Sequence, residues 1–136
     1  MDNILQKIKK DGFRLTKIRK AMVGIFVGEK KPITSSEIQE GLSLVDIKAD
    51  RTTVYRELLF LLERKIIKKI QFSDHKMYYE ICSDHHHHLV CLKCNSVKEI
   101  VLEGHLERQE KDIYAKEKFK VLEHSLEFYG LCEKCI

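Results

Sequence analysis

The stretch from Asp84 to Cys94 reads D-H-H-H-H-L-V-C-L-K-C, and the rest of the chain is organised around it. Four consecutive histidines lead into Cys91-x-x-Cys94, and a second pair, Cys132-x-x-Cys135, follows near the end of the sequence. Two such pairs supply the four thiolates of one tetrahedral zinc site, because each turn lets two sulfurs converge on one ion. We therefore predict a structural zinc ion bound by these four cysteines.

The four histidines cannot all bind one ion if they lie on a β-strand, because successive side chains of a strand point to opposite faces. His85 and His87 would face one way, and His86 and His88 the other. This geometry suggests two further metal sites, one on each face of the strand. The alternatives are a solvated polar run for the histidines, and buried thiols or a redox pair for the cysteines.

The composition is that of a globular protein of one or two small domains: 136 residues, 43% of them hydrophobic and 34% charged. No apolar run approaches the ~18 residues of a membrane helix, and the N-terminus has no signal-peptide pattern. We therefore expect a cytoplasmic protein without a membrane partner. Disulfides are disfavoured in that compartment, which supports metal binding by the cysteines.

Charge is distributed unevenly along the chain. Met1 to Glu80 contains 17 Lys and Arg residues against 11 Asp and Glu, whereas Ile81 to Ile136 contains 8 against 10. All seven histidines and all five cysteines lie at or after His75. A basic first part without metal ligands suggests a polyanionic partner, and the second part is the one suited to metal binding.

Apolar spacing in the first part predicts helices followed by two strands. The helices are expected over residues 3–10, after a Thr16 cap, from Ser35 or Ser36 to Leu42, and from Asp50 to Arg64; the strands over 65–72 and 76–81. Helices followed by a hairpin indicate a winged helix-turn-helix, whose last helix enters the major groove of double-stranded DNA. The predicted DNA-contacting residues are Arg51, Thr52, Thr53, Tyr55, Arg56, Arg14 and Arg19. The alternative for this helix end is a solvated face.

The second part is predicted to follow a hinge at residues 82–84. Strands are expected over 87–91 and 97–101, and a helix over 106–118 with Ile113 facing inward. Residues 121–129 alternate cleanly, which places Leu122, His124, Leu126 and Phe128 on one inward face. An inward histidine is often a hydrogen-bonded core residue, but the histidine run in the same domain favours His124 as a metal ligand.

Taken together, these motifs resemble those of the ferric uptake regulator (Fur) family of bacterial metal-sensing repressors, over essentially the full length. The matching segments are T-T-V-Y-R at 52–56, the histidine-cysteine stretch at 85–94, E-H-S-L at 123–126 and G-L-C-E-K-C at 130–135. The resemblance implies an α+β fold, with a winged-helix DNA-binding domain at 1–81 and an α/β dimerisation domain at 85–136. It also implies a homodimer that binds palindromic operators when a regulatory metal is loaded.

The family's two other metal sites carry over onto residues of this chain. One would use His85, His87, Glu107 and His124. The other, near the hinge, would use Glu80, His86, His88 and Glu99. These two sets agree with the division of the histidines by strand parity. Tyr55 and Arg56 fall where the family's recognition helix touches DNA.

Two departures from the family pattern bear on the sensed metal. Many iron-type members read H-H-D-H, whereas this chain has His87 at the aspartate position. The N-terminal domain often donates a histidine near the position of Lys31, but residues 1–74 contain none, so His75 or Cys82 could substitute. Three imidazoles and a carboxylate suit tetrahedral zinc. We therefore favour zinc as the regulatory metal, then iron, with manganese or peroxide sensing as further alternatives.

Two other classes of function compete with a repressor. Histidine, cysteine and glutamate could build a zinc hydrolase or deaminase, but neither H-E-x-x-H nor H-x-E with P-C-x-x-C occurs in the sequence. A DNA-binding module with purely structural zinc is the third possibility. We expect no enzymatic activity and no small-molecule substrate.

Overall fold

The computed structural model describes residues 1–104 and 106–136 and divides into two compact units, Met1–Ser83 and Asp84–Ile136. The boundary falls inside the segment predicted as a hinge. The α+β class expected from the sequence is confirmed. No helix in the described part of the chain is long and apolar enough to cross a membrane.

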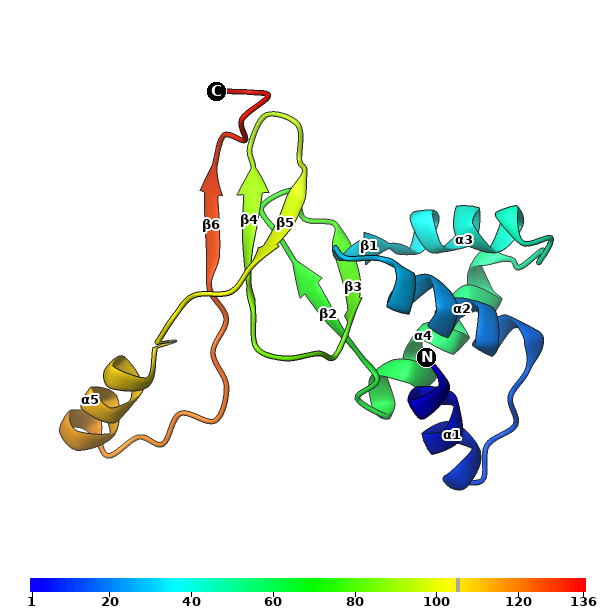
Figure 1. Ribbon diagram of the computed structural model, residues 1–136, viewed down its shortest axis with the longest axis horizontal. Helices are drawn as coiled ribbons and strands as arrows, with labels where there is room; N and C mark the ends of the chain where they lie inside the picture. The colour runs from blue at the N-terminus through cyan, green and yellow to red at the C-terminus, as the bar shows by residue number, and fades with distance from the viewer. Residues whose placement is uncertain (105) are drawn as a thin grey trace. The chain divides into compact units, whose positions relative to one another are not determined.

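The N-terminal unit consists of four helices and a small antiparallel sheet (Figure 1). In chain order the elements are α1 (Asp2–Lys10), α2 (Lys17–Gly28), β1 (Ile33–Thr34), α3 (Ser35–Leu44), α4 (Arg51–Glu63), β2 (Ile67–Gln71) and β3 (Met77–Ile81). The sheet order is β1-β3-β2, and β2 and β3 form the predicted hairpin. The short strand β1 has no alternating pattern of its own, and the sequence analysis missed it.

Side-chain caps determine where three of these helices begin. The Oγ1 atom of Thr16 accepts a hydrogen bond from Arg19 N (3.2 Å), and Asp50 Oδ1 accepts one from Thr53 N (2.7 Å), as predicted. Helix α3, in contrast, is capped by Thr34 and not by Ser35 or Ser36. Thr34 exchanges hydrogen bonds with Glu37, which forms a capping box.

One hydrophobic core holds the N-terminal unit together. Its fully buried members include Met22 and Phe26 of α2, Leu42 of α3, and Leu58 and Leu61 of α4. Val54 joins the same buried stripe on α4, as its helical spacing predicted. Because α4 packs through this stripe, the other side of its first two turns is left exposed.

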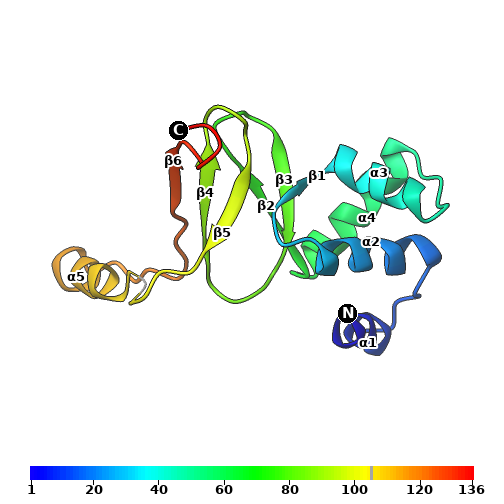
Figure 2. The ribbon, with the colours of Figure 1, turned by 45° about the horizontal axis from the view of Figure 1, so that its top comes forward.

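The C-terminal unit contains β4 (His87–Cys91), β5 (Val97–Ile100), α5 (Glu107–Glu117) and β6 (Glu127–Gly130). Its sheet order is β5-β4-β6, with β4 in the centre (Figure 2). Strand β5 pairs antiparallel with β4, whereas β6 pairs with it in parallel. The C-terminal ends of β4 and β6 therefore lie side by side at the same end of the sheet.

Two expectations for this unit were wrong. The alternating segment over 121–129 forms a strand only from Glu127, which pairs with His88 of β4. Leu122, expected to face inward, is 87% exposed. Ile113 was also expected inward, but it is 39% exposed, and α5 buries none of its residues within the chain.

Candidate metal centres and DNA-facing surface

The four paired cysteines come together just beyond the adjacent C-terminal ends of β4 and β6. Cys91 is the last residue of β4 and lies opposite Gly130 of β6, so both strands run directly into their C-x-x-C turns. A hydrogen bond from Leu92 N to Gly130 O (2.8 Å) continues the pairing into the turns. Asn95, with a φ of 57°, donates its N–H to Cys91 O and closes the first turn.

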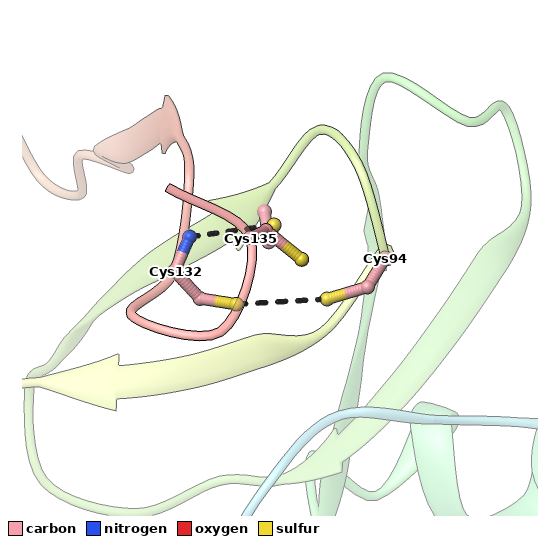
Figure 3. Close-up of side chains that lie close together, drawn as sticks. Cys94, Cys132 and Cys135 are labelled. Atoms are coloured by element: carbon pink, nitrogen blue, oxygen red, sulfur yellow. Dashed lines mark hydrogen bonds between the residues drawn. The ribbon is translucent and has the colours of Figure 1, made fainter.

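The spacing of the four sulfurs suits a tetrahedral ion. All four Sγ atoms lie within 4.8 Å of one another, and those of Cys94 and Cys132 are 3.8 Å apart. Figure 3 shows these two side chains pointing toward each other, with Cys135 beside them. With Zn–S bonds of about 2.3 Å, tetrahedral geometry requires sulfurs about 3.8 Å apart. The sulfur spacing is therefore close to that of a tetrahedral zinc site.

The electrostatics of the group also favour a cation. The backbone N–H of Cys132, followed by those of Cys94 and Lys93, lowers the pKa of the Cys91 thiol to about 6. The Cys132 side chain, burial and the other thiols raise the pKa of Cys135 to about 12. Cys91 therefore ionises readily, whereas the neighbouring thiols oppose the ionisation of Cys135. A bound divalent cation favours ionisation of the thiols, because it binds the thiolate form.

A second group gathers three imidazoles from His85, His87 and His124. Their potential ligand nitrogens lie within 4.8 Å of one another. The ring of His85 lies 4.7 Å from that of His87 and 4.4 Å from that of His124, measured between centroids. His87 is fully buried, and β4 positions it beside the segment that leads into β6. Three converging imidazoles are the donor set of many zinc sites.

The carboxylate predicted for this group, Glu107, is the first residue of α5 and is exposed. A second glutamate of the same helix, Glu110, brings its Oε1 to 2.6 Å from His124 Nδ1. Glu110 was not among the predicted site residues, although its position three residues from Glu107 on the same helix face was a usable signal.

His86 and His88 form a separate pair in the C-terminal unit, with ring centroids 5.0 Å apart. His86 donates its Nδ1–H to the backbone oxygen of Asp84 (2.8 Å), and its Nε2 lies 3.8 Å from Glu99 Oε1. Glu99 reaches this position because it pairs opposite His88 across β4 and β5. Glu80, the fourth residue of this predicted set, lies in β3 of the N-terminal unit, where it forms an ion pair with Lys68 (3.1 Å).

The predicted DNA contacts fall mostly on the exposed end of α4. Arg51, Thr52, Tyr55 and Arg56 are exposed, Thr53 is half-buried, and Arg14 is exposed in the loop before α2. Tyr55, Arg51 and Thr52 also line a cavity of about 430 Å³ shared with the N-terminal end of α3. This surface offers guanidinium, hydroxyl and aromatic groups without competing acidic residues among those that line the cavity.

Arg19 fits a DNA contact poorly. Its side chain is only 12% exposed, and its guanidinium forms two hydrogen bonds with Glu57. A further hydrogen bond goes to the backbone oxygen of Arg14 (2.7 Å). The structure thus uses this arginine to hold α2 against α4, which the sequence pattern of basic residues did not reveal.

Comparison with known proteins agrees with this architecture. The family model for the ferric uptake regulator family matches residues 10–129. The ferric uptake regulation protein of Bacillus subtilis is 36% identical, over 99% of this chain and 96% of the relative. The peroxide operon regulator of the same organism is 27% identical, over 96% of this chain and 90% of the relative. A structure of the Helicobacter pylori ferric uptake regulator, described as revealing three functional metal binding sites, superimposes with a TM-score of 0.82 at 25% identity, covering 98% of this chain and 89% of that one.

The match begins at the last residue of α1 and covers the later helices and strands of both units, including β4 with its histidines and Cys91, whereas Cys132 and Cys135 follow its end. On this evidence, the chain belongs to the ferric uptake regulator family, whose members are metal-binding transcriptional regulators and not enzymes.

Proposed function

We propose that this protein is a metal-responsive repressor, which binds operator DNA as a homodimer when a regulatory divalent ion is loaded. The observation that carries this proposal is the joint presence of a four-thiolate group, a three-imidazole group and an exposed, basic helix end in one small chain. The three functional metal binding sites reported for the Helicobacter pylori relative support three separate sites here.

The cysteine group would hold a structural zinc ion. Four thiolates leave no open position for a water or substrate, so the site is suited to stabilising the fold. Because the unfolded chain cannot hold the four sulfurs together, the free energy of zinc binding becomes free energy of folding.

The three-imidazole group would be a regulatory or supporting site, and we favour zinc as its ion. Imidazole nitrogens are good ligands for zinc and also accept iron, whereas the family's iron-type members often have an aspartate where this chain has His87. Iron is therefore the second candidate and manganese the third. The imidazoles must be neutral to bind an ion, so acid weakens metal binding.

His86, His88 and Glu99 would supply the second regulatory site, with Glu80 as the predicted ligand from the N-terminal unit. An ion bound on both sides of the hinge would restrict the relative motion of the two units. The ion can shift the equilibrium toward the DNA-binding arrangement only to the extent that it binds this arrangement more tightly than the other arrangements. The metal-free protein would then bind its operator weakly.

Operator recognition would use the exposed end of α4 in the major groove. Arg51 and Arg56 would contact guanine edges or phosphates, and Tyr55 a thymine methyl group or the backbone. Thr52, Thr53 and Arg14 are further candidates for phosphate contacts. In a dimer, two such helices about one DNA turn apart, ~34 Å, would read a palindrome.

The homodimer is supported by apolar surface that the C-terminal unit does not bury. Leu122 is 87% exposed, Phe119 64% and Tyr114 58%. Helix α5 has no buried residue among those described, so its apolar side chains remain partly open to solvent in a single chain. A second copy of the unit would cover this surface at little cost.

The decisive experiment is DNA binding as a function of metal. Duplexes selected from a random pool by the zinc-loaded protein would be titrated with metal-free, Zn²⁺-, Fe²⁺- and Mn²⁺-loaded protein. We expect tight binding only in the presence of a regulatory ion, at a stoichiometry of two chains per palindrome. Equal binding after removal of the weakly held ions would favour a structural module, and the absence of any DNA binding would refute the proposal.

A further inference from the structure

We propose that Glu110 is a positioning residue of the His85, His87 and His124 site, and that it acts by holding the ring of His124 in one tautomer. This inference rests on the proposed metal-binding function of the three-histidine group. It adds a residue to the set that the sequence predicted, in which Glu107 was the carboxylate.

The first step is the contact between Glu110 and His124. Glu110 Oε1 lies 2.6 Å from His124 Nδ1, a short distance that is typical of a charge-assisted hydrogen bond. The two side chains are 33% and 19% exposed, so solvent competes only weakly for this bond. A carboxylate has no hydrogen to donate, and therefore the hydrogen must be on Nδ1 of the imidazole.

The second step concerns the other nitrogen of the same ring. With its hydrogen on Nδ1, a neutral His124 has its lone pair on Nε2. That atom is buried and has no hydrogen-bond partner among the described residues. The ring of His124 lies 4.4 Å from that of His85 and 5.6 Å from that of His87. Glu110 thus selects the tautomer whose lone pair is available to an ion shared with these two histidines.

The third step is the difference between the two glutamates of α5. Glu107 and Glu110 are three residues apart, on one face of the helix, so sequence spacing alone would allow either of them to contact His124. The helix places Glu110 against His124 and leaves Glu107 exposed at its first turn. A carboxylate on the outer nitrogen of a ligating histidine fixes the ring and increases its basicity, and its loss costs about 10- to 100-fold in metal affinity.

The test compares matched variants of the full-length protein, Glu110→Ala and Glu107→Ala, with Glu110→Gln as a milder change that keeps the side chain's size. After the four-cysteine site is filled, Zn²⁺ affinity of the remaining sites is measured by competition with a chromophoric chelator. We expect about a 10- to 100-fold weaker histidine site in Glu110→Ala. Glu107→Ala tests separately the ligand that the family resemblance implies, and circular dichroism should show all variants folded.

A second readout reports on the tautomer and does not depend on affinity. Two-dimensional ¹⁵N–¹H correlation of the histidine rings in the zinc-depleted histidine site should show His124 as the Nδ1–H form in the parent. Both Glu110 variants should shift it toward the Nε2–H form or a mixture, whereas Glu107→Ala should not.

Three results would overturn the assignment of Glu110: parent-like affinity in Glu110→Ala, a loss confined to Glu107→Ala, or an Nε2–H tautomer in the parent. Failure of the metal site itself is recognised separately with His124→Ala. If that variant retains the parent's zinc stoichiometry and affinity, the three-histidine group is not a metal site, and Glu110 then has no role in metal binding.

Discussion

Arg19 and Glu57 form a two-point ion pair that joins α2 to α4. Arg19 Nε donates to Glu57 Oε2 at 2.9 Å, and its Nη2 donates to Glu57 Oε1 at 3.0 Å. The same guanidinium lies 3.5 Å from the centre of the Phe60 ring. The pair is about seven-eighths buried, so its geometry constrains how α4, with its exposed basic end, is held against α2.

Replacing Arg19 by lysine should therefore destabilise the N-terminal unit. Lysine provides a point charge, which cannot reproduce the two parallel hydrogen bonds or the stacking on Phe60. We expect a loss of about 3 kcal/mol in the free energy of unfolding, measured by urea denaturation, and a similar loss for Glu57→Gln. Arg14→Lys, at an exposed position, is the control. A loss of DNA affinity in Arg19→Lys with unchanged stability would instead support the DNA contact predicted from the sequence.

Cys132→Ser should remove one zinc ion per chain and lower the melting temperature of the C-terminal unit. The remaining three thiolates cannot complete a closed tetrahedral site, and the free energy of folding supplied by the ion is lost. Metal content by mass spectrometry and thermal melting provide the measurements. Lys134→Ala, at an exposed position between Cys132 and Cys135 that carries no thiol, is the control. Equal zinc content in the two variants would contradict the assignment.

The hairpin of β2 and β3 should have a pH-dependent stability with a broad plateau. Tyr78 donates its hydroxyl hydrogen to Asp74 Oδ2 at 2.5 Å. Burial, together with this bond, raises the pKa of Tyr78 to about 12, and the same bond lowers the pKa of Asp74. The contribution of Tyr78 to the free energy of unfolding is fully present below its ordinary pKa of 10.0 and is lost as the pH rises toward 12. The contribution of Asp74 is fully present above its ordinary pKa of 3.8 and is lost as the pH falls below that value.

Absorbance of ionised tyrosine and urea denaturation across the pH range would measure both limbs of this profile. Tyr78→Phe should remove the tyrosine that ionises at the highest pH and weaken the pH dependence of stability at both ends of the range. Tyr114→Phe, at a position that is 58% exposed, should change neither. If Tyr78 titrates together with the exposed tyrosines, the hydrogen bond to Asp74 is not maintained in solution.

Arg56→Ala should weaken operator binding and leave fold and metal content intact. Loss of one base contact costs about 1–3 kcal/mol, and loss of a phosphate contact also lowers the salt dependence of binding. Fluorescence anisotropy at several salt concentrations separates the two cases. Arg108→Ala, an exposed position on α5, is the control for a simple loss of positive charge. Unchanged affinity and salt dependence would mean that the exposed end of α4 does not face the DNA.

His86→Ala combined with His88→Ala should abolish the response of DNA binding to added metal. The variant removes both imidazoles of the pair next to Glu99 and leaves the four-cysteine group untouched. It should keep its structural zinc and its dimer, as checked by metal analysis and light scattering. Lys93→Ala with Lys98→Ala provides an exposed double control. A parent-like response to metal would transfer the switching role to the His85, His87 and His124 site.

The sequence predicted the elements whose signals are local. The Asp50 cap and the stripe of Val54, Leu58 and Leu61 made α4 recognisable, and the two C-x-x-C pairs identified the sulfurs that meet in space. The alternation of side chains along a strand separated His85 and His87 from His86 and His88, and the ring distances show the same division.

The parts that could not be predicted depend on partners far along the chain. The alternating pattern of residues 121–129 carries no information about its register with β4, in which Glu127 pairs with His88. Which glutamate of α5 contacts His124 depends on the rotation of α5 about its axis, which helical spacing does not specify. The Thr34 cap was predictable, since Thr34 and Glu37 have the spacing of a capping box, but the adjacent serines were equally plausible caps.

The parallel pairing of β4 with β6 has a consequence for the order of folding. The hairpin of β4 and β5 closes a short loop and can form within microseconds, whereas Cys94 and Cys132 are 38 positions apart. Bringing β6 into the sheet therefore carries most of the loop-closure entropy of the C-terminal unit. An ion captured first by Cys91 and Cys94 would give the late-arriving Cys132 and Cys135 a place to attach. An ion bound in this order would make the rate at which β6 joins the sheet depend on the concentration of that ion.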